Sequence, residues 1–456
     1  MVIGPDPAHD PVHGAATLRP FGGAAPAAWM AGRVRALREA EDDAQTVLAF
    51  QLTGLATHAI DPAEVVWVID LAPAEGERAW RVLKALSGRA PRGAPIRYMA
   101  CCVDSAHHAR LAAHPLLKPL VSNGSLLLEH AFLDHSFRDD ASPDSPFAHR
   151  QSARMPAHIV RNPIVVLAHE GISSLSQGLF ASRSGELLEA WRDGRGGLDW
   201  RATTRRDGVM RLLSTYRQSI DDAAFTLPHG AMRALSALLQ TSGGRLLLRA
   251  SDLGAKDIAQ LRMGALDPER SDAPADGLGS ALRVNFEALA RWHRTQGGSV
   301  HQSQRDDHGR VLHIALHDIA GGRLQECLPE VLGLPHPDDH VQLLLAMEAL
   351  SAVSPAQCLA LLHAQAGDPR ALLALSRHMR QSASSLEGAA LTQWRDMLTN
   401  CGAQHYPHAD CDAKGEGARD EISALIADLA MDLHDPFSQP IALTAYPRAS
   451  KRDPPA

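Results

Sequence analysis

The segment that decides the fold of this chain is Val65-Val66-Trp67-Val68-Ile69-Asp70-Leu71-Ala72-Pro73-Ala74-Glu75-Gly76. Its apolar run ends at Asp70, a loop of small residues follows, and Gly76 precedes an amphipathic run over residues 78–86. A short, continuous run rich in β-branched residues predicts a strand that is buried on both faces. A strand, a small-residue loop and a helix form the local geometry that brings a nucleotide-like ligand against backbone N–H groups.

Further apolar runs predict strands that follow this first one. They cover residues 96–102, 125–134, 164–168 and 245–249. Helical spacing of apolar residues is found over 31–55, 107–117, 185–239 and 285–296. Residues 299–316 predict a hairpin that turns around Asp307-His308-Gly309.

This alternation of strands and helices predicts an α/β fold. We expect a doubly wound, mostly parallel sheet that is closed by an antiparallel C-terminal hairpin. Ligands of such sheets bind at the carboxyl ends of the strands. The sequence places five polar or reactive residues at that edge, namely Asp70, Cys102, Asp134, His169 and Glu170.

The chain is expected to divide into four parts. Residues 1–28 are rich in Gly, Pro and Ala without periodicity, which predicts a flexible arm, and 29–318 form the α/β domain. Apolar residues at helical spacing over 319–435 predict an all-α domain, in which a degenerate two-helix repeat is one arrangement. The Pro-rich residues 436–456 predict a flexible tail.

Composition excludes several classes of protein. The net charge of -7 does not favour binding to nucleic acid or to an anionic membrane, because both attract clustered positive charge. The first thirty residues lack the pattern of a secretory signal, and no run reaches membrane-spanning length. The six scattered cysteines do not form a secreted disulfide framework. We therefore expect a cytoplasmic protein with reduced thiols.

The α/β region resembles the class I S-adenosylmethionine-dependent methyltransferases. It is most similar to those of the MidA type, the group that includes the mitochondrial complex I assembly methyltransferase. The resemblance lies within residues 60–316 and is carried by Val68–Gly76, Asn162–Glu170, Leu247–Gly254 with Asp252, and Val284–Leu289. It implies S-adenosyl-L-methionine as the cofactor, bound by Asp70, Ala72, Ala74, Gly76, Cys102 and Asp134.

The chain departs from the family pattern in ways that bear on this cofactor. Family glycines let the backbone approach the methionine portion of the cofactor, whereas Ala72 and Ala74 stand at two of these positions. The family places an acid for the ribose hydroxyls after the second strand, where this chain has Cys102. A thiol cannot replace a bidentate carboxylate. Asp134 is implied to accept a hydrogen bond from the adenine amino group.

His169 and Glu170 are the candidate catalytic residues, the alternative being an ordinary strand end. The family counterpart is Asn-Glu, so Glu170 matches and His169 departs. Glu170 could hold a guanidinium or amine nucleophile by a charge-assisted hydrogen bond, and His169 could accept a proton near neutral pH. Methyl transfer itself depends mainly on the alignment of nucleophile, methyl group and sulfur.

No metal site is predicted. The densest set of potential ligands is Cys401, His405, His408, Asp410 and Cys411, whose spacing matches no zinc pattern.

Functions from two different classes remain open. The first is an S-adenosylmethionine-dependent methyltransferase whose helical domain binds a protein substrate or partner; the acceptor is unidentified, and protein arginine is the one that the family implies. The second is a non-catalytic methyltransferase-like scaffold, which Ala72, Ala74 and Cys102 favour. A nicotinamide-dependent oxidoreductase is disfavoured because the Gly-rich fingerprint and its following acid are absent.

Overall fold

A computed structural model of the chain describes residues 26–91, 93–129, 160–192, 198–203, 209–220, 222–266, 282–304, 310–318, 323–336, 353–365, 367–382, 388–404 and 406, with the isolated positions 339, 343 and 346. Within these residues, none of the helices has both the length and the apolar character needed to cross a bilayer.

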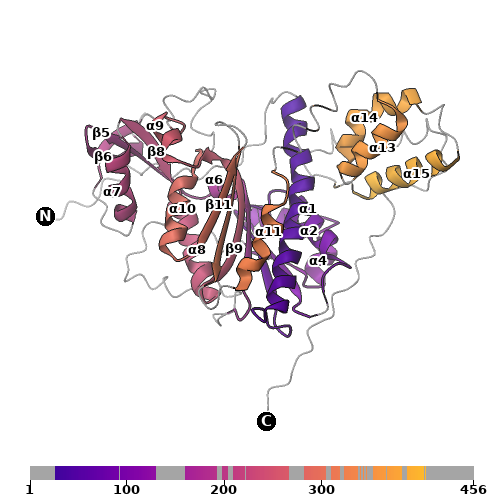
Figure 1. Cartoon of the computed structure of the whole chain (residues 1–456), viewed down its shortest axis with the longest axis horizontal. Helices are drawn as coiled ribbons and strands as arrows, with labels where there is room; N and C mark the ends of the chain where they lie inside the picture. Colours follow the sequence, from indigo (N-terminus) through magenta and orange to yellow (C-terminus); the bar gives the residue numbers. More distant parts are fainter. Residues whose placement is uncertain are drawn as a thin grey trace, which may run out of the picture.

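The fold is organised around a large twisted sheet (Figure 1). Its strands are β1 (Val66–Asp70), β2 (Ile96–Cys101), β3 (Leu126–Glu129), β4 (Ile164–His169), β9 (Arg245–Ala255), β10 (Val284–Asn285), β11 (Ser299–Gln304) and β12 (Arg310–Asp318). The strand order is β11-β12-β9-β4-β1-β2-β3, and β10 pairs with β9. The strands from β9 to β3 run parallel, whereas β12 is antiparallel to both of its neighbours. The prediction of a mostly parallel sheet is confirmed.

Helices cover both faces of this sheet. Those on one face are α1 (Pro26–Ala56), α2 (Glu77–Leu86), α3 (Ser105–Ala113), α4 (Lys118–Ser122), the 3-10 helix η2 (Arg323–Cys327) and α11 (Leu328–Leu332). Those on the other face are α6 (Gly171–Ser174), α8 (His229–Thr241) and α10 (Phe286–Thr295). The same core continues to α7 (Val209–Ser219), which packs on α10, and to α9 (Ile258–Arg262), which packs near the end of β9.

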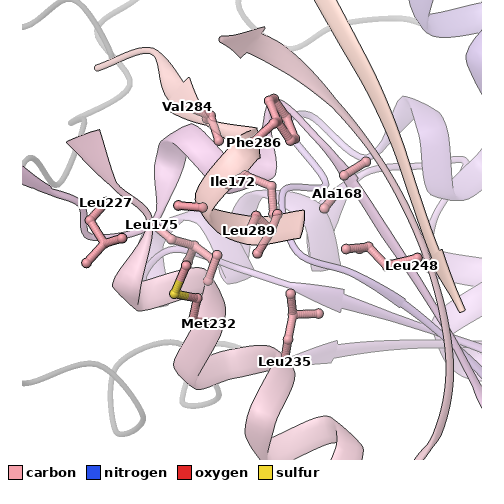
Figure 2. Close-up of a cluster of buried hydrophobic side chains, with 14 of the residues drawn as sticks. Ala168, Ile172, Leu175, Leu227, Met232, Leu235, Leu248, Val284, Phe286 and Leu289 are labelled. Carbon is pink, nitrogen blue, oxygen red and sulfur yellow. The ribbon is translucent and has the colours of Figure 1, made fainter. Parts of the chain in front are cut away.

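The alternation of side chains along each strand produces two separate cores. Val68 packs in the core under α1 and α2, and the adjacent Ile69 packs in the core under α8 and α10. Figure 2 shows the second core, where Leu248 of β9 lies near Leu235 of α8 and Leu289 of α10. Because both of their faces are buried, the central strands β1 and β4 consist almost entirely of apolar residues, which is the pattern that predicted them.

An additional antiparallel sheet interrupts the fold between β4 and β9. Its strands are β5 (Gly178–Arg183), β6 (Glu186–Arg192), β7 (Leu198–Ala202) and β8 (Ala223–Leu227), in the order β7-β6-β5-β8. The prediction of helix over 185–239 is therefore wrong for β6, β7 and β8, and right for α7 and α8. Ser184 and Gly185 both have positive φ in the two-residue turn between β5 and β6, which is the geometry that closes a tight hairpin.

Helices α13 (Pro355–Ala364), α14 (Pro369–Ser382) and α15 (Gly388–Ala403) pack around an apolar cluster of their own. Figure 1 shows them at the opposite end of the molecule from the β5–β8 sheet. Ser354 and Gln357 form a capping box at the start of α13, with Pro355 at the first helical position. The predicted helical domain of residues 319–435 extends beyond the described residues, so its boundaries stay a prediction.

Candidate functional site

The candidate site lies where the direction of strand addition reverses. The chain leaves β1 to form β2 and β3 on one side, and then crosses to form β4 on the other side of β1. The loops that follow β1 and β4 therefore diverge at the carboxyl edge, which is where ligands of open α/β sheets bind. Gly171, which follows β4 at the start of α6, lies next to Ala72, in the loop after β1. The space between them is so narrow that a Cβ added to Gly171 would lie 3.3 Å from the Ala72 Cβ.

The loop after β1 keeps a glycine-like backbone at a residue that is not glycine. Ala74 has a φ of 45° and Gly76 a φ of 82°, both in the left-handed region. For an L-residue with a Cβ this conformation costs about 1–2 kcal/mol. Ala74 is exposed, Ala72 is half-buried and Gly76 is buried. The backbone of the loop after β1 therefore keeps a conformation that favours glycine, and the methyl group of Ala74 projects from its exposed tip.

Asp70 orders this loop from within. Its Oδ1 accepts from the Ala72 N–H at 3.1 Å and from Arg78 Nη1 at 3.4 Å, and its Oδ2 accepts from the Tyr98 hydroxyl at 2.8 Å. The residue has no exposed surface. Both carboxylate oxygens are therefore engaged by the protein itself, so the structure gives Asp70 a role in shaping the loop.

His169 points away from the carboxyl edge. It follows Val165 and Leu167 on the side of β4 that faces α1, and it is almost completely buried. His169 Nε2 lies 2.8 Å from Asp43 Oδ1, and His169 Nδ1 lies 2.6 Å from the Ser251 hydroxyl. His169 and Glu170 are thus adjacent in sequence but on different sides of the strand, so the structure does not bring their side chains together.

Asp43 belongs to a buried charge network that the sequence did not predict. Burial opposes its ionisation, but attraction to His169, to Arg249 and to Arg78 holds the pKa of Asp43 below its usual value. Arg249 Nε lies 3.2 Å from Asp43 Oδ1, and Arg78 is within 4.0 Å of both Asp43 and Glu39. The sequence signal is that Glu39 and Asp43 are one turn apart, on the face of α1 that carries the core residue Val47.

Glu170 is the polar group of this edge that faces outward. It has a φ of 55°, a conformation that is strained for a non-glycine residue and that is found most often at functional sites. Its side chain is 64% exposed, and its Oε1 accepts from Arg310 Nη2 at 2.6 Å. A carboxylate held in this way can accept a further hydrogen bond from solvent or from a ligand.

Asp252 lies beside this ion pair at the end of β9. Its two carboxylate oxygens accept from the Ser173 and Leu253 N–H groups, each at 2.9 Å. Burial raises the pKa of Asp252 to about 6, although Arg310 and Ser173 act in the opposite direction. Glu170, Asp252 and Arg310 therefore form a compact polar group at the carboxyl ends of β4 and β9.

Cys102 does not provide a ligand group for a ribose. The residue is buried, its Sγ lies 3.8 Å from the Ala100 carbonyl oxygen, and burial raises the pKa of its thiol to about 12. Asp104 caps α3 instead, because its Oδ1 accepts from the His107 N–H at 2.6 Å. Asp134 lies outside the described residues.

His107 ties the loop after β1 to the loop after β2. Its Nε2 is hydrogen-bonded to the Ala74 carbonyl oxygen, and its Nδ1 lies 3.3 Å from the Val103 nitrogen. Val103, in the loop after β2, is 41% exposed, and Leu253, on β9, is 44% exposed, so apolar side chains are accessible along this edge. The edge thus offers a small-residue loop, apolar neighbours and the outward carboxylate of Glu170.

Comparisons with known proteins give distant structural neighbours. No family model matches the chain, and no curated protein matches it. It is similar to a COG1565 superfamily member from Burkholderia thailandensis that is bound to S-adenosyl-homocysteine, with 16% identity, 66% of this chain and 68% of that chain covered, and a TM-score of 0.34. It is also similar to a second COG1565 superfamily protein from that organism, with 12% identity, 66% and 96% coverage, and a TM-score of 0.36.

Proposed function

We propose that this chain is an S-adenosylmethionine-dependent methyltransferase with its cofactor site at the carboxyl edge of β1. The observation that supports this best is the conformation of the Ala72–Gly76 loop at the crossover between β1 and β4. Ala74 and Gly76 are both left-handed there, as in a loop whose backbone closely approaches a ligand. The order of the sheet and its antiparallel β12 agree with the resemblance to class I methyltransferases.

The residues present fit such a cofactor in part. The loop of Ala72, Ala74 and Gly76 would lie against its methionine portion, and Val103 would offer an apolar contact beside it. Cys102 supplies no acceptor for ribose hydroxyls, and Asp70 acts through the loop that it orders. When bound, the cofactor would supply the methyl group on a sulfonium sulfur.

Glu170 is the residue that we expect to position the methyl acceptor. Arg310 holds its carboxylate at 2.6 Å, and most of its side chain is exposed. A carboxylate in this position would accept a hydrogen bond from the N–H or O–H of a nucleophile and so fix its direction of approach. His169 is enclosed between α1 and β9, so we propose for it a supporting role beneath the site.

A non-catalytic scaffold is the second candidate, and a specific observation favours it. The acid that the family pattern places in the cofactor loop is bonded to Ala72, Arg78 and Tyr98 and has no exposed surface. Under this alternative the sheet would serve as a platform, and the helices α13–α15 would bind a protein partner. The same partner-binding role is proposed for these helices in the enzyme.

Titration calorimetry of the full chain with S-adenosylhomocysteine separates the two candidates. Saturable binding in the micromolar range supports the enzyme, and no binding at millimolar ligand supports the scaffold. Asp70→Ala would be a poor test, because it also removes the partner of Arg78 and Tyr98. Glu170→Gln is a better companion, since this side chain is exposed and its amide oxygen can still accept from the buried Arg310. It should leave binding intact and reduce methyl transfer.

A further inference from the structure

A pocket lies away from the carboxyl edge, along the later half of α2. It is lined by Glu41, Arg81, Lys84, Ala85, Ser87, Arg89 and Gln404. These residues come from α1, from α2 and its following turn, and from the residue after α15. Three of them are cations and one is an acid, in a chain whose net charge is -7. The pocket therefore concentrates positive charge against the overall balance of the protein.

Arg81 is the most deeply placed of these cations. Its side chain is only 5% exposed, and its Nε and Nη2 donate to Glu77 Oε1 at 2.8 and 2.6 Å. Its Nη1 is buried and has no hydrogen-bond partner among the described residues. A buried guanidinium N–H without a partner costs free energy, which a ligand oxygen would recover once the Arg81 side chain turns toward the pocket.

Lys84 stands next to Arg81 and links the pocket to the C-terminal helices. Its Nζ donates to the Ala403 carbonyl oxygen at 2.7 Å and to Gln404 Oε1 at 3.2 Å. These acceptors are neutral, so they do not balance its charge. Burial and the repulsion of Arg81 lower the pKa of Lys84 to about 8. The two cations therefore lie close enough to repel each other.

The acid in the pocket compensates this charge incompletely. Glu41 lies 3.8 Å from Arg89 and 3.5 Å from Arg38, so it is shared between two arginines at the pocket mouth. Arg89 is 54% exposed, which leaves it able to turn toward a ligand. Of the two inner cations, Arg81 pairs with Glu77, whereas Lys84 donates to neutral acceptors.

We propose that this pocket binds a phosphate group, either as inorganic phosphate or as a small phosphomonoester. A phosphate carries several strong acceptor oxygens, so it suits a pocket that is lined by the three cations Arg81, Lys84 and Arg89. The cavity encloses about 240 Å³. Pockets for drug-sized ligands enclose about 300–1,000 Å³, so the ligand here is small. Lys84 of α2 is hydrogen-bonded to Ala403 and Gln404 at the end of α15. A bound phosphate would therefore also stabilise the contact between α2 and α15.

The test is titration calorimetry of the full chain with inorganic phosphate, with glycerol phosphate, and with sodium chloride at matched ionic strength. Phosphate should bind saturably and chloride should not. Arg89→Gln should weaken phosphate binding about threefold, and Glu41→Gln should strengthen it by about the same factor, because each changes one partly exposed charge. Tighter binding of glycerol phosphate identifies a monoester as the ligand, and equal or weaker binding identifies inorganic phosphate.

A matched control is provided by Arg161, an exposed arginine that is paired with Glu64 at 3.1 Å and does not line the pocket. Arg161→Gln should leave phosphate binding unchanged. The proposal is overturned if phosphate gives no saturable binding, if Arg161→Gln weakens binding as much as Arg89→Gln, or if Glu41→Gln fails to strengthen it. Arg81 is not substituted in this series, because its loss would leave the buried Glu77 without its ion-pair partner.

Discussion

His169 and Asp43 face each other inside the protein, with His169 Nε2 2.8 Å from Asp43 Oδ1 and neither side chain exposed. The two residues are 126 positions apart in the chain, so this contact fastens α1 to β4. Arg249 of β9 adds a second contact to Asp43 at 3.2 Å. The carboxyl edge of the sheet is therefore built on a buried network of charges.

Asp43→Ala should destabilise the protein strongly. The substitution removes the nearest carboxylate of both Arg249 and His169 and leaves them the more distant Asp42 and Glu39, and breaking a buried pair in this way costs about 3–5 kcal/mol. The free energy of unfolding from urea titration at pH 7 measures the loss. Asp43→Asn should cost less, because its amide oxygen still accepts from His169.

The control for this prediction is Asp199→Ala. Asp199 also pairs with an arginine, since its Oδ2 lies 2.8 Å from Arg201 Nε, but both side chains are more than 40% exposed. Exposed pairs contribute about 0–1 kcal/mol. Equal losses for Asp43→Ala and Asp199→Ala would show that the buried network is not a structural support.

A cluster of buried histidines should make stability depend on pH. His293 Nδ1 lies 2.7 Å from His317 Nε2, and the ring of His313 lies 5.3 Å from that of His293. Burial, and then Arg294, lower the pKa of His313 to about 3, and burial with the neighbouring histidines lowers that of His293. The unfolded chain takes up these protons near pH 6.5. Stability should fall as pH drops from about 6.5 to 3, by up to about 1.4 kcal/mol per pH unit for each such histidine.

Urea titrations of the wild type and His313→Asn between pH 7.5 and 5 check this slope. Asparagine at 313 does not titrate, so the variant should lose less stability on acidification. Asp252, whose pKa is raised to about 6, acts in the opposite sense in both proteins, so its contribution cancels. The exposed His301 on β11 provides the control, and His301→Asn should keep the wild-type slope. A slope unchanged by His313→Asn contradicts the prediction.

The main sheet was predictable because its strands are buried on both faces. β1 and β4 are nearly continuous apolar runs and β2 is interrupted only by Arg97; short runs of this kind that are bounded by turn residues predict strands. The small sheet was missed because β6 and β7 mix polar and apolar residues, as in Glu186–Arg192, and this pattern also fits a helix. The decisive signal is the Ser184-Gly185 turn, which the helical reading of 185–239 overlooked.

For the candidate site, the sequence could predict the face of the sheet on which a strand residue lies, but not its partners from other elements. Alternate residues of a strand point to the same face, so His169 lies on the face of Val165 and Leu167, which α1 covers. The burial of His169 could therefore have been predicted. The partners of His169 could not, because nothing in residues 31–55 states that α1 crosses β4 and β9. Long-range contacts such as that of Asp43 depend on how layers pack, which one sequence does not specify.

Gly76→Ala should destabilise the protein more than Gly88→Ala. The two glycines have the same backbone strain, with φ of 82° and 81°. A Cβ on Gly76 would lie 2.5 Å from Leu117 Cδ1, whereas a Cβ on Gly88 would meet nothing within 4 Å. Gly88→Ala therefore reports the cost of φ alone, about 1–2 kcal/mol, and Gly76→Ala should add about 1–3 kcal/mol for overpacking. Thermal or urea unfolding measures the difference, and equal losses would mean that Leu117 moves freely.

Ala74→Gly should tighten the binding of S-adenosylhomocysteine if the loop after β1 is a cofactor site. Glycine removes the exposed methyl group at the loop tip and relieves the left-handed strain at the same position. We expect several-fold tighter binding in titration calorimetry. Ala94→Gly is the matched control, because Ala94 has the same φ of 45° but lies before the amino end of β2, at the opposite edge of the sheet. It should change stability and leave binding as in the wild type. Identical affinities for wild type, Ala74→Gly and Ala94→Gly would contradict a cofactor site at the loop after β1.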